Sequence, residues 1–132
     1  MEVQLVSPEQ VLFTGEADMV VARTASGGEI AFLPGHAPFL GSLGHWPVRL
    51  ILADGTHQKF AVHGGFVEVS PNRVIILSDV AELHHDIDVD RARAAKTRAE
   101  ESLRANPDDA DAVAALRRAE TRLDVAGATD SL

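Results

Sequence analysis

The stretch that divides this chain into two parts is Asp86-Ile87-Asp88-Val89-Asp90-Arg91-Ala92. Before it, short apolar runs are broken by glycine and proline, and no segment keeps a 3.6-residue period for three turns. After it, alanine and arginine recur at helical spacing. The sequence therefore predicts an α+β protein, with a β domain over residues 1–85 and a helical domain over residues 86–132.

The first part has the alternation that is typical of half-buried strands. Val3 and Leu5, and later Val20 and Ala22, alternate with polar or differently facing neighbours. Further strands are expected at Gly28–Leu33, Val48–Leu52, Lys59–Val62, Phe66–Val69 and Val74–Leu77. Turn signals such as the Asp54-Gly55 pair recur about every 8–12 residues, which favours an antiparallel β sandwich or barrel over βαβ units.

The Gly64-Gly65 pair lies between two of these expected strands. Two glycines permit positive φ angles or a close approach of two backbones. A phosphate-binding loop would need a helix directly after the glycines, whereas Phe66–Val69 has the character of a strand. We therefore expect a bulge at a corner of the sheet.

The second part predicts a hairpin of two helices. Asp86 and Asp88 are candidate caps for the first helix, and its apolar stripe is Ala92, Ala95, Ala99 and Leu103. The first helix should end, and the second should be capped, within residues 106–109, because Pro107 prevents one continuous helix. The second helix is expected to bury Val113, Leu116, Ala119 or Glu120, and Leu123, and to end around Gly127. Both stripes are thin, so the hairpin should dock on the sandwich or on a partner, and should detach at low cost.

Composition excludes several classes of protein. The net charge of −8 argues against a nucleic-acid-binding hairpin, which would need a basic surface. The chain has no cysteine, so a disulfide framework or a thiolate metal site is impossible. The N-terminus lacks the pattern of a secretory signal, and no apolar run approaches the roughly 20 residues that span a bilayer. We expect a cytoplasmic protein that is soluble or peripherally attached.

Two pairs of arginines are the strongest candidates for a ligand site. Arg91 and Arg98 share a face of the first helix, and Arg118 and Arg122 share a face of the second. If these faces meet, four guanidinium groups converge, and like charges would repel unless an anion such as phosphate filled the site. The alternative is a solvated helix surface with i,i+4 pairs, for example Glu100 with Arg104.

The remaining titratable groups give weaker signals. Glu82 and Asp88 are placed to accept a hydrogen bond from an amine or a ribose hydroxyl of the same ligand. The six histidines show no spacing typical of a metal site. A small sandwich enzyme that uses His36 or His63 as a base is another alternative, but no second catalytic group lies at a persuasive spacing.

Three segments are similar to those of a known family: residues 6–9 (Val-Ser-Pro-Glu), residues 28–38 (Gly-Glu-Ile-Ala-Phe-Leu-Pro-Gly-His-Ala-Pro) and residues 64–69 (Gly-Gly-Phe-Val-Glu-Val). Over nearly its whole length the chain resembles the epsilon subunits of bacterial F-type ATP synthases. The resemblance implies a ten-stranded β sandwich followed by a two-helix hairpin. It also implies a subunit without catalysis of its own, in the rotating stalk that couples proton flow to ATP synthesis.

The resemblance implies partners and a location as well. The sandwich would contact the gamma subunit and the c ring, and an extended hairpin would reach the alpha and beta catalytic subunits and hinder ATP hydrolysis. The chain would lie on the cytoplasmic face of the bacterial cell membrane without inserting into it.

In some bacterial members a helix-opening motif, Ile/Leu-Asp-x-x-Arg-Ala, marks ATP binding to the folded hairpin. Here the motif is present as Ile87, Asp88, Arg91 and Ala92, and the accompanying acid and later arginines are matched by Glu82, Arg98, Arg118 and Arg122. The resemblance thus implies ATP as a regulatory ligand, with no required cofactor and no metal. A free-standing nucleotide-sensing module and a passive adaptor without ATP binding are the alternatives.

Overall fold

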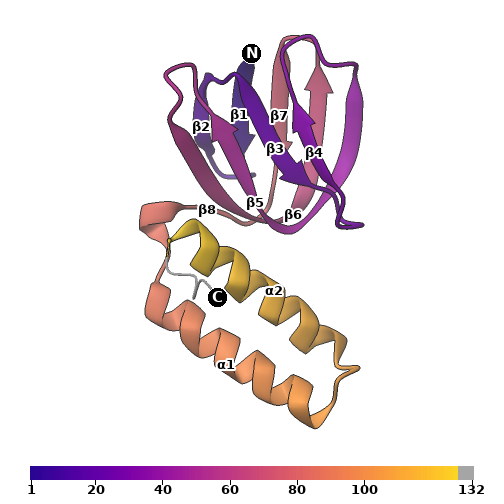
Figure 1. The fold of residues 1–132 in the computed structure, drawn as a ribbon, viewed down its shortest axis with the longest axis vertical. Helices are drawn as coiled ribbons and strands as arrows, with labels where there is room; N and C mark the ends of the chain where they lie inside the picture. The colour runs from indigo at the N-terminus through magenta and orange to yellow at the C-terminus, as the bar shows by residue number, and fades with distance from the viewer. Residues whose placement is uncertain (128–132) are drawn as a thin grey trace.

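The computed structural model describes residues 1–127, so the last residues of the predicted helical part, 128–132, lie outside it (Figure 1). A β domain comes first and two helices follow. The strands are β1 (Glu2–Val6), β2 (Val11–Glu16), β3 (Met19–Arg23), β4 (Glu29–Phe32), β5 (Phe39–Ile51), β6 (His57–Ser70), β7 (Arg73–Leu77) and β8 (Ala81–Leu83). After them come a short 3₁₀ helix, η1 (His84–Asp86), and the helices α1 (Val89–Ala105) and α2 (Ala110–Val125).

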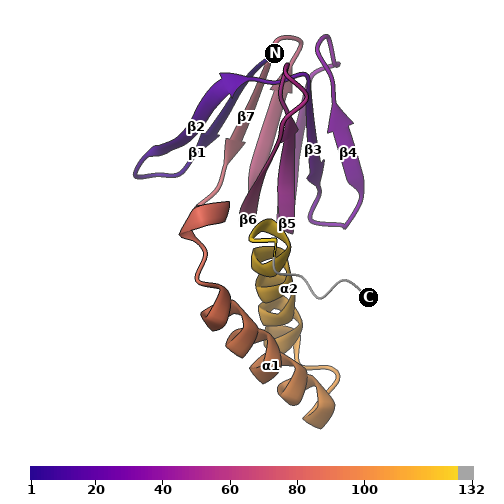
Figure 2. The same ribbon diagram turned by 60° about the vertical axis from the view of Figure 1, so that its left-hand side comes forward.

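The strands lie in the order β2-β1-β7-β6-β5-β3-β4, and β8 pairs with β6. Figure 2 shows the sheet folded on itself, with β2, β1 and β7 on one side and β3 and β4 on the other. The sandwich is confirmed, with eight strands in the described residues where the family resemblance implied ten. The purely antiparallel expectation was wrong for one pair, because β1 runs parallel to β7. These two strands are far apart in sequence, so no hairpin forces them to be antiparallel.

Two strands are longer than the sequence predicted. Lys59–Val62 and Phe66–Val69 were expected as separate strands, but both belong to β6. One half of β6 pairs with β8 and the other half pairs with β7. Likewise β5 begins well before the predicted Val48 and pairs with β6 along its length. A strand that serves both layers reads as two strands in sequence, because its burial pattern changes where it bends.

The bend in β6 lies at Gly64 and Gly65, whose φ angles are 81° and 119°. A Cβ atom on Gly65 would lie 2.0 Å from the carbonyl oxygen of Leu77, so the site requires glycine. The register with β5 is the same on both sides of the bend, with Leu43 opposite Gly65 and His45 opposite His63. The glycines therefore bend the strand without the extra residue of the expected bulge.

A large apolar core fills the sandwich. Val3, Leu5, Val20 and Ala22 are each at most 2% exposed, as their alternation predicted. The largest fully buried side chains are Phe32, Phe60, Leu5, Leu50 and Ile76. This core makes the β domain a rigid platform on which the helices dock.

The helices form the predicted hairpin. Asp88 caps α1 by accepting a hydrogen bond from the Arg91 amide, and Asp109 caps α2 by accepting one from the Ala112 amide. In both views α2 lies next to β5 and β6, and α1 lies beyond it, away from the sheet (Figures 1 and 2). The hairpin is thus attached to the sandwich mainly through α2.

The seam between the helices consists largely of alanine. In α1 the buried residues are Ala92 and Ala99, with Ala95 and Leu103 half-buried, as the predicted stripe required. In α2 the prediction failed for Val113, which is 52% exposed, while Ala112 is buried in its place. Because α2 buries one part of its surface against α1 and another against the sandwich, a prediction from a single apolar stripe did not identify all of its buried residues.

Candidate functional site

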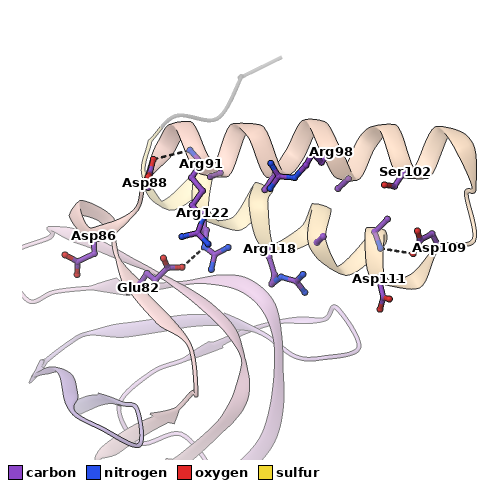
Figure 3. Close-up of a pocket in the computed structure, with 15 residues that line it drawn as sticks. Glu82, Asp86, Asp88, Arg91, Arg98, Ser102, Asp109, Asp111, Arg118 and Arg122 are labelled. Carbon is purple, nitrogen blue, oxygen red and sulfur yellow. Dashed lines mark hydrogen bonds and ion pairs between the residues drawn. The ribbon is translucent and has the colours of Figure 1, made fainter.

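A cavity of about 640 Å³ opens between α1 and α2, next to Glu82 of β8 (Figure 3). Arg91 and Arg98 line it from α1, and Arg118 and Arg122 line it from α2. In Figure 3, Arg91 extends from α1 toward Arg122. The structure thus brings the two arginine pairs, selected from their spacing in the sequence, to one site.

Only one of these four arginines has a carboxylate partner within residues 1–127. The Nε of Arg122 donates to Oε1 of Glu82 at 2.7 Å. For Arg91, Arg98 and Arg118, the described part of the chain provides no ion pair and no side-chain hydrogen bond. The local pair expected under the solvated-surface alternative, Glu100 with Arg104, is also absent from the described residues. Three guanidinium groups therefore stay available to an anion.

Glu82 is held in place from two sides. Its Oε1 accepts from His63 Nε2 at 3.0 Å as well as from Arg122. The hydrogen bond from His63, followed by that from Arg122, lowers the pKa of Glu82 against the opposing effect of burial. Glu82 therefore fixes Arg122 to the sandwich. Its Oε1, one of the oxygens expected to accept a hydrogen bond from a ligand, is already used in this contact.

The remaining residues of the helix-opening motif have different surroundings. Asp88 lines the cavity, but one of its oxygens caps α1 at 3.1 Å from the Arg91 amide. Ala92 is 3% exposed and forms part of the wall. Ile87 is the one predicted site residue that the structure places elsewhere: it is buried with Ala61 and Val125. Its contribution is to anchor the start of the hairpin on β6 and α2.

Sequence reasoning missed several polar residues of the cavity. Asp86, Ser102, Asp109 and Asp111 also line it. Figure 3 places the carboxylates at the two ends, with the arginines between them. Asp109 and Asp111 could have been found from their position at the start of α2, which a close hairpin brings beside the end of α1. The arrangement suits a ligand with an anionic group and, beside it, hydrogen-bond donors.

A second set of contacts joins the C-terminal half of α2 to the sandwich. Thr121 Oγ1 donates to the His45 carbonyl oxygen at 2.7 Å. Lys59 Nζ lies 3.0 Å from Asp124 Oδ1, and the Arg117 guanidinium lies 3.9 Å from the centre of the Trp46 ring. The three α2 residues are spaced i, i+4 and i+7, so they share one face of the helix. We call this face of α2 the docking face.

Two histidines lie beneath the docking face. The rings of His45 and His63 are 5.7 Å apart, and the Nδ1 atoms of both are buried without a hydrogen-bond partner among residues 1–127. Burial lowers the pKa of His45, and the neighbouring His63 and the α2 arginines lower it further. The side chain of His63 is 3% exposed, so a substrate cannot reach it as the enzyme alternative would require.

The other histidines do not form a metal site in the part of the chain described. His84 and His85 lie in η1, with ring centres 6.1 Å apart. Within residues 1–127 there is no group of three or more His, Asp or Glu side chains arranged to hold a metal ion. In the same residues, neither helix has the length and apolar character needed to cross a bilayer.

Comparison with known proteins gives consistent matches over both parts of the chain. The family model described as "ATP synthase, Delta/Epsilon chain, beta-sandwich domain" matches residues 1–84, and "ATP synthase, Delta/Epsilon chain, long alpha-helix domain" matches residues 85–127. An "ATP synthase epsilon chain" of Halalkalibacterium halodurans is 46% identical over 131 residues, covering 96% of this chain and 97% of the relative. The chain of that name from Streptomyces griseus is 42% identical, covering 93% of this chain and 92% of the relative.

A solved structure shares the fold. A chain in the Euglena gracilis mitochondrial ATP synthase structure (OSCP/F1/c-ring, rotational state 1) matches with a TM-score of 0.78 at 23% sequence identity. The match covers 94% of this chain and 79% of that chain. At this identity the likeness concerns the fold.

Proposed function

This chain belongs to the ATP synthase delta/epsilon-chain family, and we propose that it is a central-stalk rotor subunit whose folded hairpin binds ATP. As an epsilon chain it is a non-catalytic subunit of the complex. In this proposal the sandwich contacts the gamma subunit and the c ring at the cytoplasmic face of the cell membrane and helps couple proton flow to ATP synthesis. The hairpin regulates ATP hydrolysis by moving between a docked form and a form extended toward the alpha and beta subunits.

The observation that carries the ATP-binding proposal is the convergence of four guanidinium groups on one cavity. Arginine forks bind phosphate oxygens in a bidentate manner. The volume of about 640 Å³ lies within the roughly 300–1,000 Å³ usual for small-molecule sites. The triphosphate would lie among the arginines, and the carboxylates at one end of the cavity would accept hydrogen bonds from the adenine amine or the ribose hydroxyls.

Binding at this site would favour the docked hairpin for a geometric reason. The arginines come from both helices, and Arg122 is tied through Glu82 to β8. A ligand that contacts all of them binds only when both helices are in place on the sandwich. A ligand at about 100 times its dissociation constant would shift the equilibrium by roughly 2.7 kcal/mol.

Arg98 offers the cleanest test of ATP binding. Arg98→Gln removes a charge from the cavity without breaking an ion pair within residues 1–127, whereas a change at Arg122 would also release Glu82. We expect isothermal titration calorimetry to show ATP binding to the unaltered chain and at least tenfold weaker binding to Arg98→Gln. Arg104→Gln, at an exposed position of α1 that does not line the cavity, is the matched control. Equal ATP affinity of the two variants, or no ATP binding by the unaltered chain, would contradict this site and favour the alternative of a passive adaptor.

An apolar row on the outer face of the sandwich supports a contact with another subunit. Val11, Leu77 and Phe66 are 59%, 45% and 54% exposed. Val6 pairs with both Val11 and Leu77, and Leu77 pairs with Phe66, so the row crosses four adjacent strands. A continuous exposed apolar surface of this kind is typical of a protein interface, and we assign it to the gamma subunit.

Co-purification tests this assignment and separates it from the free-standing module. A tagged chain should recover gamma-type and c-type subunits from its own cells. Phe66→Glu should reduce that recovery, because a charge would be buried in the contact. Ser70→Glu, at an exposed position of the same strand beyond the row, serves as the control. Failure to recover any ATP synthase subunit would favour the free-standing module.

A further inference from the structure

A second, smaller cavity of about 190 Å³ lies on the other side of α2, between that helix and strands β3, β4, β5 and β6. We call it the docking groove. Its charged residues are Arg23, Glu29, Arg49, Lys59, Arg117 and Asp124. None of its lining residues also lines the interhelical cavity, so the two sites are separate.

The charge of the docking groove is opposite to that of the chain. Four basic and two acidic side chains give it a net charge of +2 (4 − 2), whereas the whole chain has −8. Arg49 of β5 lies directly opposite Lys59 of β6, and like charges in that position destabilise a sheet. An arrangement of this kind requires compensation by negative charge.

The acids in the groove compensate only part of this charge. Glu29 pairs with Arg23 at 3.6 Å, and Asp124 pairs with Lys59 at 3.0 Å. Arg49 and Arg117 have no carboxylate partner within residues 1–127. The two uncompensated charges come from different parts of the fold, one from the sandwich and one from α2.

These two arginines also carry buried donors without acceptors. The Nε atoms of Arg49 and Arg117 are buried, and neither has a hydrogen-bond partner among the described residues. The Arg117 guanidinium carbon lies 3.9 Å from the centre of the Trp46 ring, a cation–π contact that holds the side chain and leaves its N–H groups for another acceptor. A buried N–H group without an acceptor is unfavourable, so the geometry points to a bound group that supplies oxygens.

We propose that the docking groove binds a small, doubly charged oxyanion, such as hydrogen phosphate, between Arg49 and Arg117. The volume corresponds to roughly six water molecules at 30 Å³ each, which admits a tetrahedral oxyanion and is too small for a nucleotide. The net charge of +2 matches such an ion. Because the two arginines lie on β5 and α2, the bound ion links the hairpin to the sandwich and favours the docked form, independently of ATP.

Trp46 gives a direct readout because it is the one tryptophan of the chain and lies in the groove. The full chain is titrated with sodium phosphate while sodium chloride keeps the ionic strength constant. We expect a saturable change in tryptophan emission. Arg49→Gln should weaken binding at least about tenfold, since it removes a charge-assisted hydrogen bond. This substitution lies on a strand and removes a like-charge contact, so the variant should fold.

Two controls locate the site. Arg104→Gln makes the same change at an exposed position outside the groove and should bind phosphate normally. Arg98→Gln, in the interhelical cavity, should also bind normally, so this test is independent of ATP binding. Arg49→Lys keeps the charge but loses the planar fork and should bind with intermediate affinity.

Nuclear magnetic resonance sharpens the test, because phosphate should shift the Nε–Hε signals of Arg49 and Arg117 more than those of other arginines. Sulfate should reproduce the effect and acetate, with a single charge, should be weaker. The proposal is overturned if sodium chloride alone gives the same emission change. It is also overturned if Arg49→Gln binds phosphate normally, or if Arg98→Gln abolishes binding.

Discussion

The sandwich and the hairpin are stabilised in different ways. Buried Phe32, Phe60 and Leu50 fill the sandwich, while the seam between α1 and α2 consists of alanines such as Ala92 and Ala99. Apolar stabilisation scales with buried area, so alanine contributes far less than phenylalanine. The difference shows how one chain can combine a platform that stays folded with a helical part that a ligand or a partner can move.

The largest effect should come from the sandwich core. Phe60→Ala removes a ring that is 1% exposed and packs against Phe13, and it should cost about 3–5 kcal/mol in the free energy of unfolding. Ala99→Gly, in the seam, should cost about 1 kcal/mol through helix propensity and affect mainly the hairpin. Urea unfolding followed by circular dichroism measures the first, and amide hydrogen exchange in the helices measures the second. If Ala99→Gly lowered the protection of the sandwich amides as much as that of the helix amides, the two parts would be one cooperative unit.

The docking face provides the next test. Thr121 is fully buried, and its hydroxyl bonds to the His45 carbonyl oxygen. Thr121→Val keeps the shape but leaves that oxygen without its donor, which should cost about 1–3 kcal/mol in docking. Hydrogen exchange should become faster in α2 and stay unchanged in β1 and β7. Thr97→Val, at an exposed position of α1, is the matched control. If this control accelerated exchange in α2 as much as Thr121→Val does, a role of Thr121 in docking would be contradicted.

Local features of this architecture were predictable from the sequence, and nonlocal ones were not. The helix caps Asp88 and Asp109 and the shared faces of the arginine pairs follow from spacing within a few turns. The bond network of His63, Glu82 and Arg122 joins three elements and has no local signature. Val113 was misassigned because α2 buries surface against both α1 and the sandwich. The bend at Gly64 and Gly65 resembled a gap between strands because glycine interrupts the apolar pattern.

A smaller effect should follow acidification. The pKa of His45 is lowered in the docked form, so the undocked form binds more protons between that pKa and the ordinary value of about 6.5. Docking should therefore be fully stable above about pH 6.5 and weaken as the pH falls below it. The charged or titratable groups around His45 are His63, Arg117, Arg118 and Arg122, with Glu82 beyond His63.

Glu82 should weaken docking further at lower pH. Because its pKa is lowered in the docked form, its ionised carboxylate stabilises that form fully above the ordinary pKa of about 4.3. This contribution is lost as the pH falls through the lowered pKa. Hydrogen exchange in α2, corrected for the intrinsic pH dependence, checks the direction. His45→Gln should remove the part of the effect that begins as the pH falls below about 6.5. Stronger docking on acidification would contradict this assignment.

The smallest effect should come from the ion pair between Lys59 and Asp124. Their side chains are 39% and 43% exposed, so solvent screens the pair. A double-mutant cycle with Lys59→Met and Asp124→Asn should give a coupling free energy of about 0.2–1 kcal/mol, read from hydrogen exchange in α2. Salt should reduce this coupling further. A coupling larger than the effect of Thr121→Val would mean that charge pairing contributes more than the buried hydrogen bond to holding α2 on the sandwich. The attachment of the hairpin to its rigid platform would then depend on ionic strength.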